Sequence, residues 1–264
     1  AENFALYETG TVLRFSEEGS LNYIRADLTP AYNSTVITSA GNQPKVREVM
    51  REFVFLRPGT VILHDRIIPT DPGAVIFNML HTQFEPQQNN DWFTVTGANS
   101  ALFINQLTPQ TTSEVITGFN VAGLDLDSAW GSPLTNEFEN EAYGRYRIQF
   151  IPATDNPIQH FLTLLIATSK DATPPDAQYV VGDGMYGAAL NDWQVMFDDD
   201  PGNITATRFE VMPGANNLLF TGLQPLGQYQ VMLPDSTDTD VQADDAGTLY
   251  IFVEQSGEIR LNAR

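Results

Sequence analysis

Short apolar runs separated by turn residues recur along most of the chain. The clearest example is residues 51–81, REFVFLRPGTVILHDRIIPTDPGAVIFNMLH, where Pro58-Gly59 and the stretch 69–73 separate three apolar runs. Proline removes a backbone donor and does not fit inside a helix of ordinary length, so each run is predicted to be a strand. Dense strands with turn signals about every 8–12 residues are typical of an all-β sandwich or barrel.

The same pattern continues on both sides of this stretch. Residues 143–151 alternate between apolar and polar positions, which predicts a half-buried strand. Residues 160–168 are almost continuously apolar, which predicts a strand buried on both faces. A long loop is expected at 123–140. Further strands are predicted at 4–7, 11–15, 21–26, 93–96, 101–107, 115–119, 178–181, 187–190, 193–197, 206–211, 217–221, 229–233, 248–254 and 258–261.

No long helix and no repeat of 20–50 residues is found, so a solenoid or propeller is not expected. The predicted fold is all-β. A large antiparallel sandwich, resembling a supersandwich, covers residues 1–200, and a smaller β portion at 201–264 packs on it. A Pro-rich joint at 173–176 is the alternative boundary.

Composition excludes several classes of protein. The 264 residues contain no cysteine, which excludes disulfides, thiolate metal sites and a cysteine nucleophile. The net charge of −20 and the lack of a basic cluster argue against nucleic-acid binding. No apolar run reaches the ~20 residues needed to cross a bilayer, so membrane insertion is not expected. The chain begins at Ala1 without methionine, as a processed secreted chain or a trimmed fragment would.

Calcium is the metal that the acidic loops suggest, because hard cations prefer several carboxylate oxygens on a flexible loop. The candidate ligands are Asp198, Asp200, Asp235, Asp238 and Asp240, although none fits the EF-hand pattern. A zinc site built from His64, Asp65, His81 and His160 is the alternative, but the spacing of these residues gives it no support.

Exposed aromatic side chains are candidates for sugar binding, since an aromatic face can pack against a sugar ring. The candidates are Trp92, Trp130, Tyr143 and Tyr186, of which Trp92, Trp130 and Tyr186 lie in or beside predicted loops. Trp193 instead precedes Val195 and Phe197 in an apolar strand, which predicts a core position.

Several short stretches in a fixed order resemble one family. They are DLTPAY at 27–32, FVFL after Arg51, VILHDRI at 61–67, LHT at 80–82, LTP at 107–109, GRYRI at 144–148, HFLTLL at 160–165, LQPLGQY at 223–229 and AGTL at 246–249. Together they resemble the C-terminal β-sandwich of heparinase II/III-like polysaccharide lyases. The resemblance implies a sandwich that would normally accompany a helical toroid, and the catalytic cleft of the family lies between the two.

Two features of that family are missing from this sequence. No helix-rich toroid is predicted, and no early H-x-H-x-D-x-G segment is present, since His64 is the first histidine. No catalytic residue is therefore carried over by motif. β-Elimination needs a base, an acid and a cation, for which His81, Tyr32 and Arg51 are the local candidates. His64 and His81 lie on neighbouring predicted strands and could approach each other. The bland alternative places His81 at a strand end, His64 at a sheet edge and Asp65 in an ion pair with Arg66 or Arg51.

Three functions remain open on this basis. The first is an extracellular, secreted module that binds polysaccharide or acts as a scaffold. The second is a structural subunit of an extracellular assembly, formed by self-association through exposed strand edges. The third is a fragment of an active lyase, with His81 or Tyr32 on a cleft wall beside Arg51.

Overall fold

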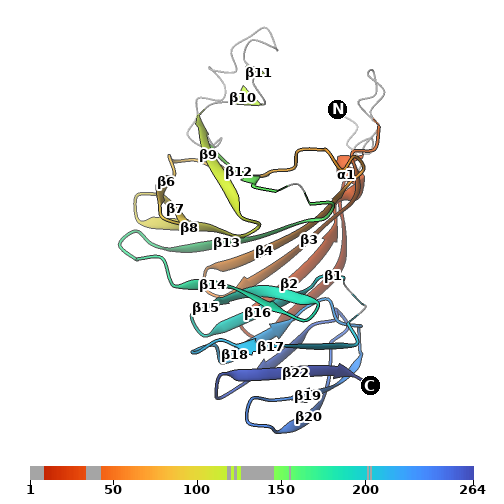
Figure 1. The fold of residues 1–264 in the computed structure, drawn as a ribbon. Coiled ribbons are helices and arrows are strands. Elements are labelled where there is room, and N and C mark those ends of the chain that lie inside the picture. The colour runs from red at the N-terminus through yellow and green to blue at the C-terminus, as the bar shows by residue number, and fades with distance from the viewer. Residues whose placement is uncertain are drawn as a thin grey trace, which may run out of the picture.

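The computed structural model describes residues 9–33, 43–117, 120–121, 124–125, 146–154, 156–200, 202 and 204–264. Within these residues the protein is almost entirely β, which confirms the predicted fold class. The one helix among them is the single turn α1 (Thr29–Tyr32), and no helix there is long and apolar enough to cross a membrane. Figure 1 shows the sheets stacked as layers, with the C-terminal strands at the bottom.

The largest layer is an eight-stranded antiparallel sheet. Its strands are, in spatial order, β1 (Thr11–Glu18), β2 (Leu21–Asp27), β3 (Val46–Leu56), β4 (Thr60–Pro69), β13 (Gln159–Ser169), β8 (Ser100–Thr108), β7 (Trp92–Thr96) and β6 (Gln87–Asn89). The apolar run at 160–168 becomes β13 at the centre of this sheet, where most of its side chains are buried. The prediction of a strand buried on both faces is therefore confirmed.

A small three-stranded sheet covers part of the outer face of this layer. It contains β5 (Asn78–Thr82), β12 (Tyr146–Pro152) and β9 (Thr111–Thr117). Ile148 and Phe150 of β12 pack against Phe93, Val95 and Ile104 of the large sheet. The described residues also contain a two-stranded hairpin of β10 (Asn120–Val121) and β11 (Leu124–Asp125).

The opposite face of the eight-stranded sheet packs on a five-stranded sheet, and a four-stranded sheet completes the stack. The five-stranded sheet contains β14 (Ala177–Gly182), β15 (Met185–Leu190), β16 (Trp193–Asp198), β18 (Asn217–Phe220) and β21 (Leu249–Phe252). The four-stranded sheet contains β17 (Ala206–Val211), β22 (Gly257–Ala263), β19 (Gln228–Met232) and β20 (Asp238–Gln242). Among the described residues, only β16 and β18 pair in parallel, and all other strand pairs are antiparallel.

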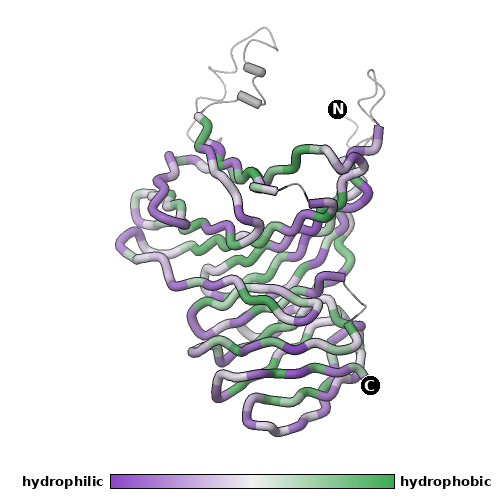
Figure 2. The backbone as a smooth tube through the Cα atoms, viewed as in Figure 1, coloured by the Kyte–Doolittle hydropathy of each residue, from purple (hydrophilic) through white to green (hydrophobic). Residues whose placement is uncertain are grey.

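Apolar side chains fill both spaces between these layers. Ile62 and Leu164 of the eight-stranded sheet meet Val195 and Phe197 of the five-stranded sheet. On the other face of the same sheet, Phe220 packs against side chains of the four-stranded sheet. Burial of one such side chain contributes about 1.5–3 kcal/mol. Figure 2 shows the apolar positions concentrated along the strands in the interior of the stack.

The five-stranded sheet draws strands from both sides of the predicted boundary at residue 200. β14, β15 and β16 precede that residue, whereas β18 and β21 follow it. The chain leaves the eight-stranded sheet after β13 and enters the five-stranded sheet at β14, so the joint at 173–176 lies in the connection between these two sheets.

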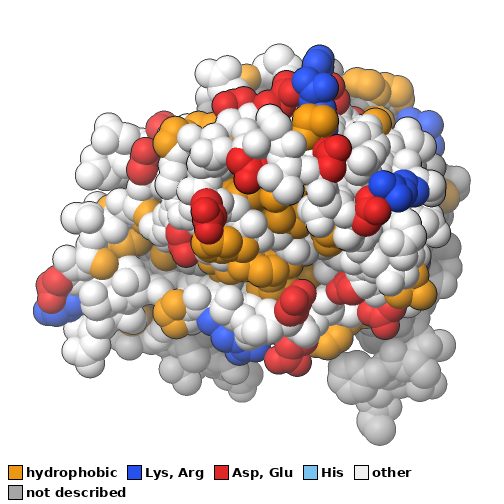
Figure 3. All heavy atoms as spheres, turned by 90° about the horizontal axis from the view of Figure 1, so that it is seen from below, with side chains coloured by type: hydrophobic (Ala, Val, Ile, Leu, Met, Phe, Trp, Pro, Cys, Tyr) orange, Lys and Arg blue, Asp and Glu red, His pale blue; other side chains and the backbone are white. Residues whose placement is uncertain are grey.

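The excess of acidic residues in the composition is visible on the bottom face of the stack. Figure 3 shows acidic side chains spread across this face, with a few basic ones and some exposed apolar atoms between them. The strand β20 lies in this region and was not predicted. Its sequence, DTDVQ, carries few apolar residues, so the pattern indicated part of an acidic loop there.

A glycine in β15 tests the packing of the five-stranded sheet. A Cβ at Gly187 would lie 1.7 Å from the backbone oxygen of Val195, so Gly187→Ala must force β15 and β16 apart. We expect it to lower the free energy of unfolding by about 3 kcal/mol or more, as measured by urea denaturation. The control is Gly73→Ala, whose Cβ would meet only Asp71 at an ordinary contact distance. Equal stability of the two variants would contradict this packing.

Candidate functional site

A buried glutamate and histidine lie between the eight-stranded and five-stranded sheets. Glu52 of β3 and His64 of β4 are directly opposite in the strand register, and their side chains are 2% and 1% exposed. His64 Nδ1 lies 2.8 Å from Glu52 Oε2. The alternation of FVFL places Glu52 on the same face as Val54 and Leu56, so the strand itself directs this carboxylate into the core.

Two hydroxyl groups complete the environment of the carboxylate. Tyr23 of β2 donates to Glu52 Oε1 at 2.6 Å, and Thr221, just after β18, donates to the same oxygen at 3.1 Å. Burial by itself would raise the pKa of Glu52, but the hydrogen bond and charge of His64 and the Tyr23 hydroxyl outweigh it, so the pKa is lowered. The carboxylate is therefore ionised, and it is held by groups from both sheets.

A chain of hydrogen bonds leads from this pair to the surface. The Tyr186 hydroxyl of β15 contacts His64 Nε2 on one side and His160 Nδ1 on the other. His160 Nε2 then lies 3.1 Å from Asp199 Oδ1. In one consistent order, Tyr186 donates to His160 Nδ1, and His160 Nε2 donates to Asp199.

The surroundings of this chain set its protonation. Burial, together with the charges of His64 and Arg66, lowers the pKa of His160 to about 3, so its ring is neutral at pH 7. Burial, followed by the charges of Glu52 and Asp199, raises the pKa of Tyr186 far above its usual range. Tyr186 therefore keeps its proton, and both nitrogens of His160 are engaged. Neither side chain is free to act as a base.

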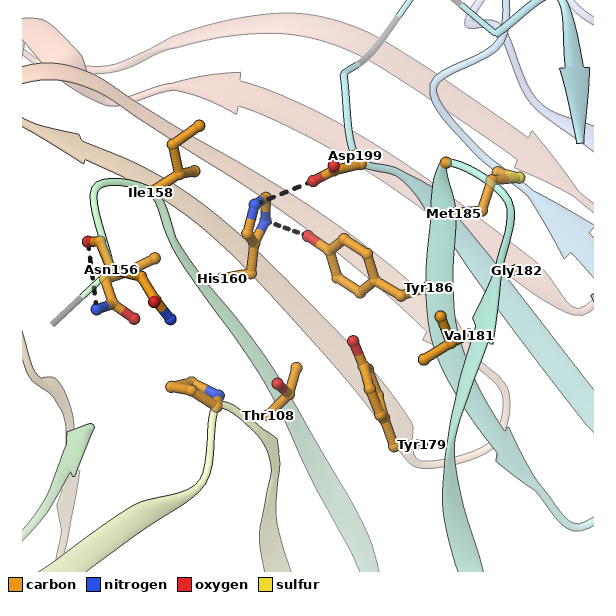
Figure 4. A pocket seen from close by; sticks show the side chains of 13 residues that line it. Thr108, Asn156, Ile158, His160, Tyr179, Val181, Gly182, Met185, Tyr186 and Asp199 are labelled. Atoms are coloured by element: carbon orange, nitrogen blue, oxygen red, sulfur yellow. Dashed lines mark hydrogen bonds and ion pairs between the residues drawn. The ribbon is translucent and has the colours of Figure 1, made fainter. Parts of the chain in front are cut away.

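The outer end of the hydrogen-bond chain opens into a pocket of about 300 Å³, which we call the first pocket. Figure 4 shows His160, Tyr186 and Tyr179 directed toward one another within it, with Asp199 beyond His160. Tyr179 of β14 is 43% exposed and lines the pocket together with Thr108. Asp199 is the one acidic side chain among the described residues that line the pocket, and none of them is Lys or Arg.

Gln159 adds an unsatisfied group to the wall of this pocket. Its side-chain nitrogen donates to the backbone oxygen of Thr154 at 3.1 Å, but its buried Oε1 has no partner among the described residues. A buried acceptor without a donor costs about 1–3 kcal/mol. The pocket thus combines a partly exposed aromatic ring with hydrogen-bonding groups and has no Lys or Arg in its described lining, which suits a small polar ligand that is not an anion.

The three catalytic candidates from the sequence do not line this pocket. Arg51 forms a two-point ion pair with Asp65, with distances of 2.6 and 2.8 Å, which confirms one of the two predicted partners of Asp65. Tyr32 of α1 is 50% exposed, and the pKa of Arg51 is raised chiefly by its hydrogen bond to Asp65. His81 is exposed on β5.

The predicted approach of His64 to His81 is wrong. β4 and β5 belong to different sheets, because β5 pairs with β12 and β4 pairs with β3 and β13. The partner of His64 is His160, whose ring stacks on it at a centroid distance of 5.7 Å. The expectation that His64 lies at a sheet edge is also wrong, since β4 is an interior strand and His64 is buried.

The aromatic candidates have different outcomes. Tyr186 is only 6% exposed and is engaged by both histidines, so it does not present a free face to a ligand. Trp92 is half-buried and packs edge-on against Phe103. Trp193, predicted as core, is partly buried against the core. Trp130 and Tyr143 lie outside the described residues.

The acidic candidates are separated by the fold. Asp198 and Asp200 lie at the end of β16, whereas Asp235, Asp238 and Asp240 lie in the β19–β20 hairpin of another sheet. Asp198 accepts backbone N–H groups of Asp200 and Gly202, and Asp240 pairs with Arg264. Within the described ranges, no three His, Asp or Glu side chains gather closely enough to hold a metal, either zinc or calcium. Calcium binding stays a prediction.

Sequence reasoning missed Glu52 and Tyr179, and it considered His160 only as a zinc ligand. One signal was present for Glu52: a charged residue occupies a core-facing position in an otherwise apolar strand. His64 occupies the matching position opposite it. Nothing in the sequence indicates that Tyr186, which is 122 residues after His64, joins them.

The pH dependence of folding stability tests the environments of His160 and Asp198. His160 has its pKa lowered from 6.5 to about 3, so the unfolded state binds a proton that the folded state refuses, and stability falls as the pH drops through this range. Asp198 has its pKa raised, mainly by burial, from 3.8 to about 7, so its contribution has the opposite sign and is lost as the pH rises through that range. Compared with the wild type, we expect His160→Gln to lose less stability between about pH 7.5 and about pH 4, and Asp198→Asn to lose more.

Urea denaturation across this pH range measures both effects. Each variant serves as the control for the other, because each removes one titrating group and the two expected effects have opposite signs. Parallel curves for the wild type and both variants would contradict the described environment.

The chain matches no protein-family model and no curated protein. Solved structures that resemble its fold include the heparan sulfate lyase HepC of Pedobacter heparinus, with a TM-score of 0.44 and 12% identity over 69% of this chain. A mutant of that lyase gives a TM-score of 0.46 and 13% identity over 71% of this chain. A heparinase III structure gives 0.45 and 12% over 71%.

The chain spans about a quarter of the length of these lyases, 26–27%. The resemblance found in the sequence, to the β portion of heparinase-type lyases, is thus found again among solved structures. At this level of identity the likeness concerns the fold and does not extend to the activity of those enzymes.

Proposed function

We propose that this protein is an extracellular carbohydrate-binding module that binds a neutral sugar in the first pocket and acts by binding or scaffolding. The observation that carries the proposal is the partly exposed ring of Tyr179 at the wall of a polar pocket. An aromatic face packs against the C–H face of a sugar, and surrounding polar groups bind its hydroxyls.

The charges of the pocket favour a neutral ligand. Asp199 faces the pocket without any Lys or Arg among its described lining residues, and the whole chain carries a net charge of −20. A uronate or sulfated sugar would meet repulsion there and no neutralising cation. Arg66 contributes, after burial and His64, to the lowered pKa of His160. Arg66 is already paired with Glu48.

The same geometry supports binding over catalysis. Elimination needs a base that is free to accept a proton. His160 has both ring nitrogens occupied, and the pKa of Tyr186 is raised, so this tyrosine stays neutral. The extracellular location is part of the proposal, because the polysaccharides that such a module would bind are found outside the cell.

Removal of the Tyr179 ring tests the proposal. The wild type is screened against an array of neutral and acidic oligosaccharides, and the best ligand is titrated by calorimetry. We expect a neutral ligand, and we expect Tyr179→Ala to weaken its binding at least roughly tenfold, because the stacking surface is lost. Tyr250→Ala is the matched control, since Tyr250 is similarly exposed, at 37%, but lies outside the pocket. Unchanged binding by Tyr179→Ala, or preference for acidic sugars, would refute the proposal.

A second function, a subunit of a self-associating assembly, is favoured by the edge strand β1. β1 pairs only with β2 among the described strands, and Val12 and Phe15 are 63% and 54% exposed. A second copy could pair antiparallel with β1 about a two-fold axis at Ser16. That register would place Arg14 opposite Glu18 of the second copy, on the same sheet face, in both halves of the interface.

Charge reversal tests this pairing. We expect Arg14→Glu to weaken self-association roughly tenfold or more, because two attractive pairs become repulsive. The double variant Arg14→Glu/Glu18→Arg should restore it. Analytical ultracentrifugation over a concentration series measures both. A monomeric wild type at every concentration, or a double variant that stays as weak as the single one, would rule out this interface.

A further inference from the structure

A second, larger pocket adjoins the first. It has a volume of about 460 Å³ and lies where β6, β7, β8, β9 and β14 meet. Tyr179 lines both pockets. The end of β8 and the connection to β9 also contribute to both pockets. Thr108 and Pro109 line the first pocket, and Leu107 and Gln110 line the second. The two pockets therefore share one wall.

The second pocket is rich in side-chain amides. The amide residues that line it are Gln88, Asn90, Asn105, Gln106 and Gln110. An amide offers both donors and acceptors, and a sugar hydroxyl does the same, so the two match without any net charge. Asp91 is the one charged residue among the described residues in this lining, and again neither Lys nor Arg is present.

The amides differ in how far they are free to bind. Gln106 is fully used within the fold, because its Oε1 accepts from Asn78 and Thr163 and its nitrogen donates to the backbone oxygens of Thr108 and Leu162. Gln88 and Gln110 are exposed. Gln106 therefore stiffens the floor of the pocket, and Gln88 and Gln110 are the side chains that can turn toward a ligand.

Tyr179 stands at the junction of the two pockets. Its ring lies 6.2 Å from the ring of Tyr186, and the side chain is 43% exposed. An exposed aromatic face can pack against the C–H face of a sugar ring. A linear ligand can therefore cross this ring and place one sugar unit on each side.

We infer that the two pockets are subsites of one groove, which binds a linear, uncharged oligosaccharide of at least three units across Tyr179. This inference rests on the proposed function and deepens it, because it adds the length of the ligand and the residues that contact its far end. Each pocket has a volume in the range typical of small-ligand sites.

A length series tests the inference. The neutral oligosaccharide selected on the array is prepared with two to six units, and each length is titrated against the full chain by calorimetry. We expect the six-unit ligand to bind at least tenfold tighter than the two-unit ligand. The double variant Gln88→Ala/Gln110→Ala should remove that advantage and leave the binding of two units unchanged.

A matched control double variant is Gln228→Ala/Gln255→Ala, which removes two exposed glutamines far from both pocket linings and should behave as the wild type. Affinity that does not change with length, or that survives in the Gln88/Gln110 variant, would overturn the groove while Tyr179-dependent binding of short ligands persisted. Failure of every neutral oligosaccharide to bind would instead refute the proposed function itself. Tighter binding of sulfated or uronate ligands would overturn the uncharged class.

Discussion

The buried hydrogen-bonded pair of Glu52 and His64 constrains the packing of the two central sheets more than any other polar contact. Removing a carboxylate from water is costly, and it is tolerated only when the carboxylate is paired and hydrogen-bonded. Here the partners come from both layers: Tyr23 from the eight-stranded sheet, Thr221 and Tyr186 from the strands of the five-stranded sheet and their ends. Apolar packing between the sheets tolerates small shifts, whereas these hydrogen bonds require one relative position of the layers.

That position also determines the shape of the binding surface. Tyr186 reaches from the buried pair to His160, and His160 reaches Asp199 at the mouth of the first pocket. The first pocket is therefore preorganised by the interior of the protein. Because every polar atom along this path has a partner, the path holds its groups in place and leaves none of them free for proton transfer.

The groove lies at the border between elements that are distant in the sequence. The β8–β9 connection, the start of β13 and the β14–β15 hairpin meet there, and Tyr179 stands between the two pockets. The described lining of this groove contains no Lys or Arg. A module with this surface would select uncharged sugars by shape and hydrogen bonding.

The sequence by itself determined the all-β class and most of the strands, because alternation, β-branched runs and proline or glycine breaks act locally. β17 at 206–211 and the doubly buried β13 follow directly from such patterns. The sequence did not determine which strands become neighbours, so β5 was placed beside β4 and His64 was paired with the wrong histidine. Only the tertiary structure brought Glu52, His64, His160 and Tyr186 together, because contacts across 122 residues depend on how the sheets stack, and no local pattern records that arrangement.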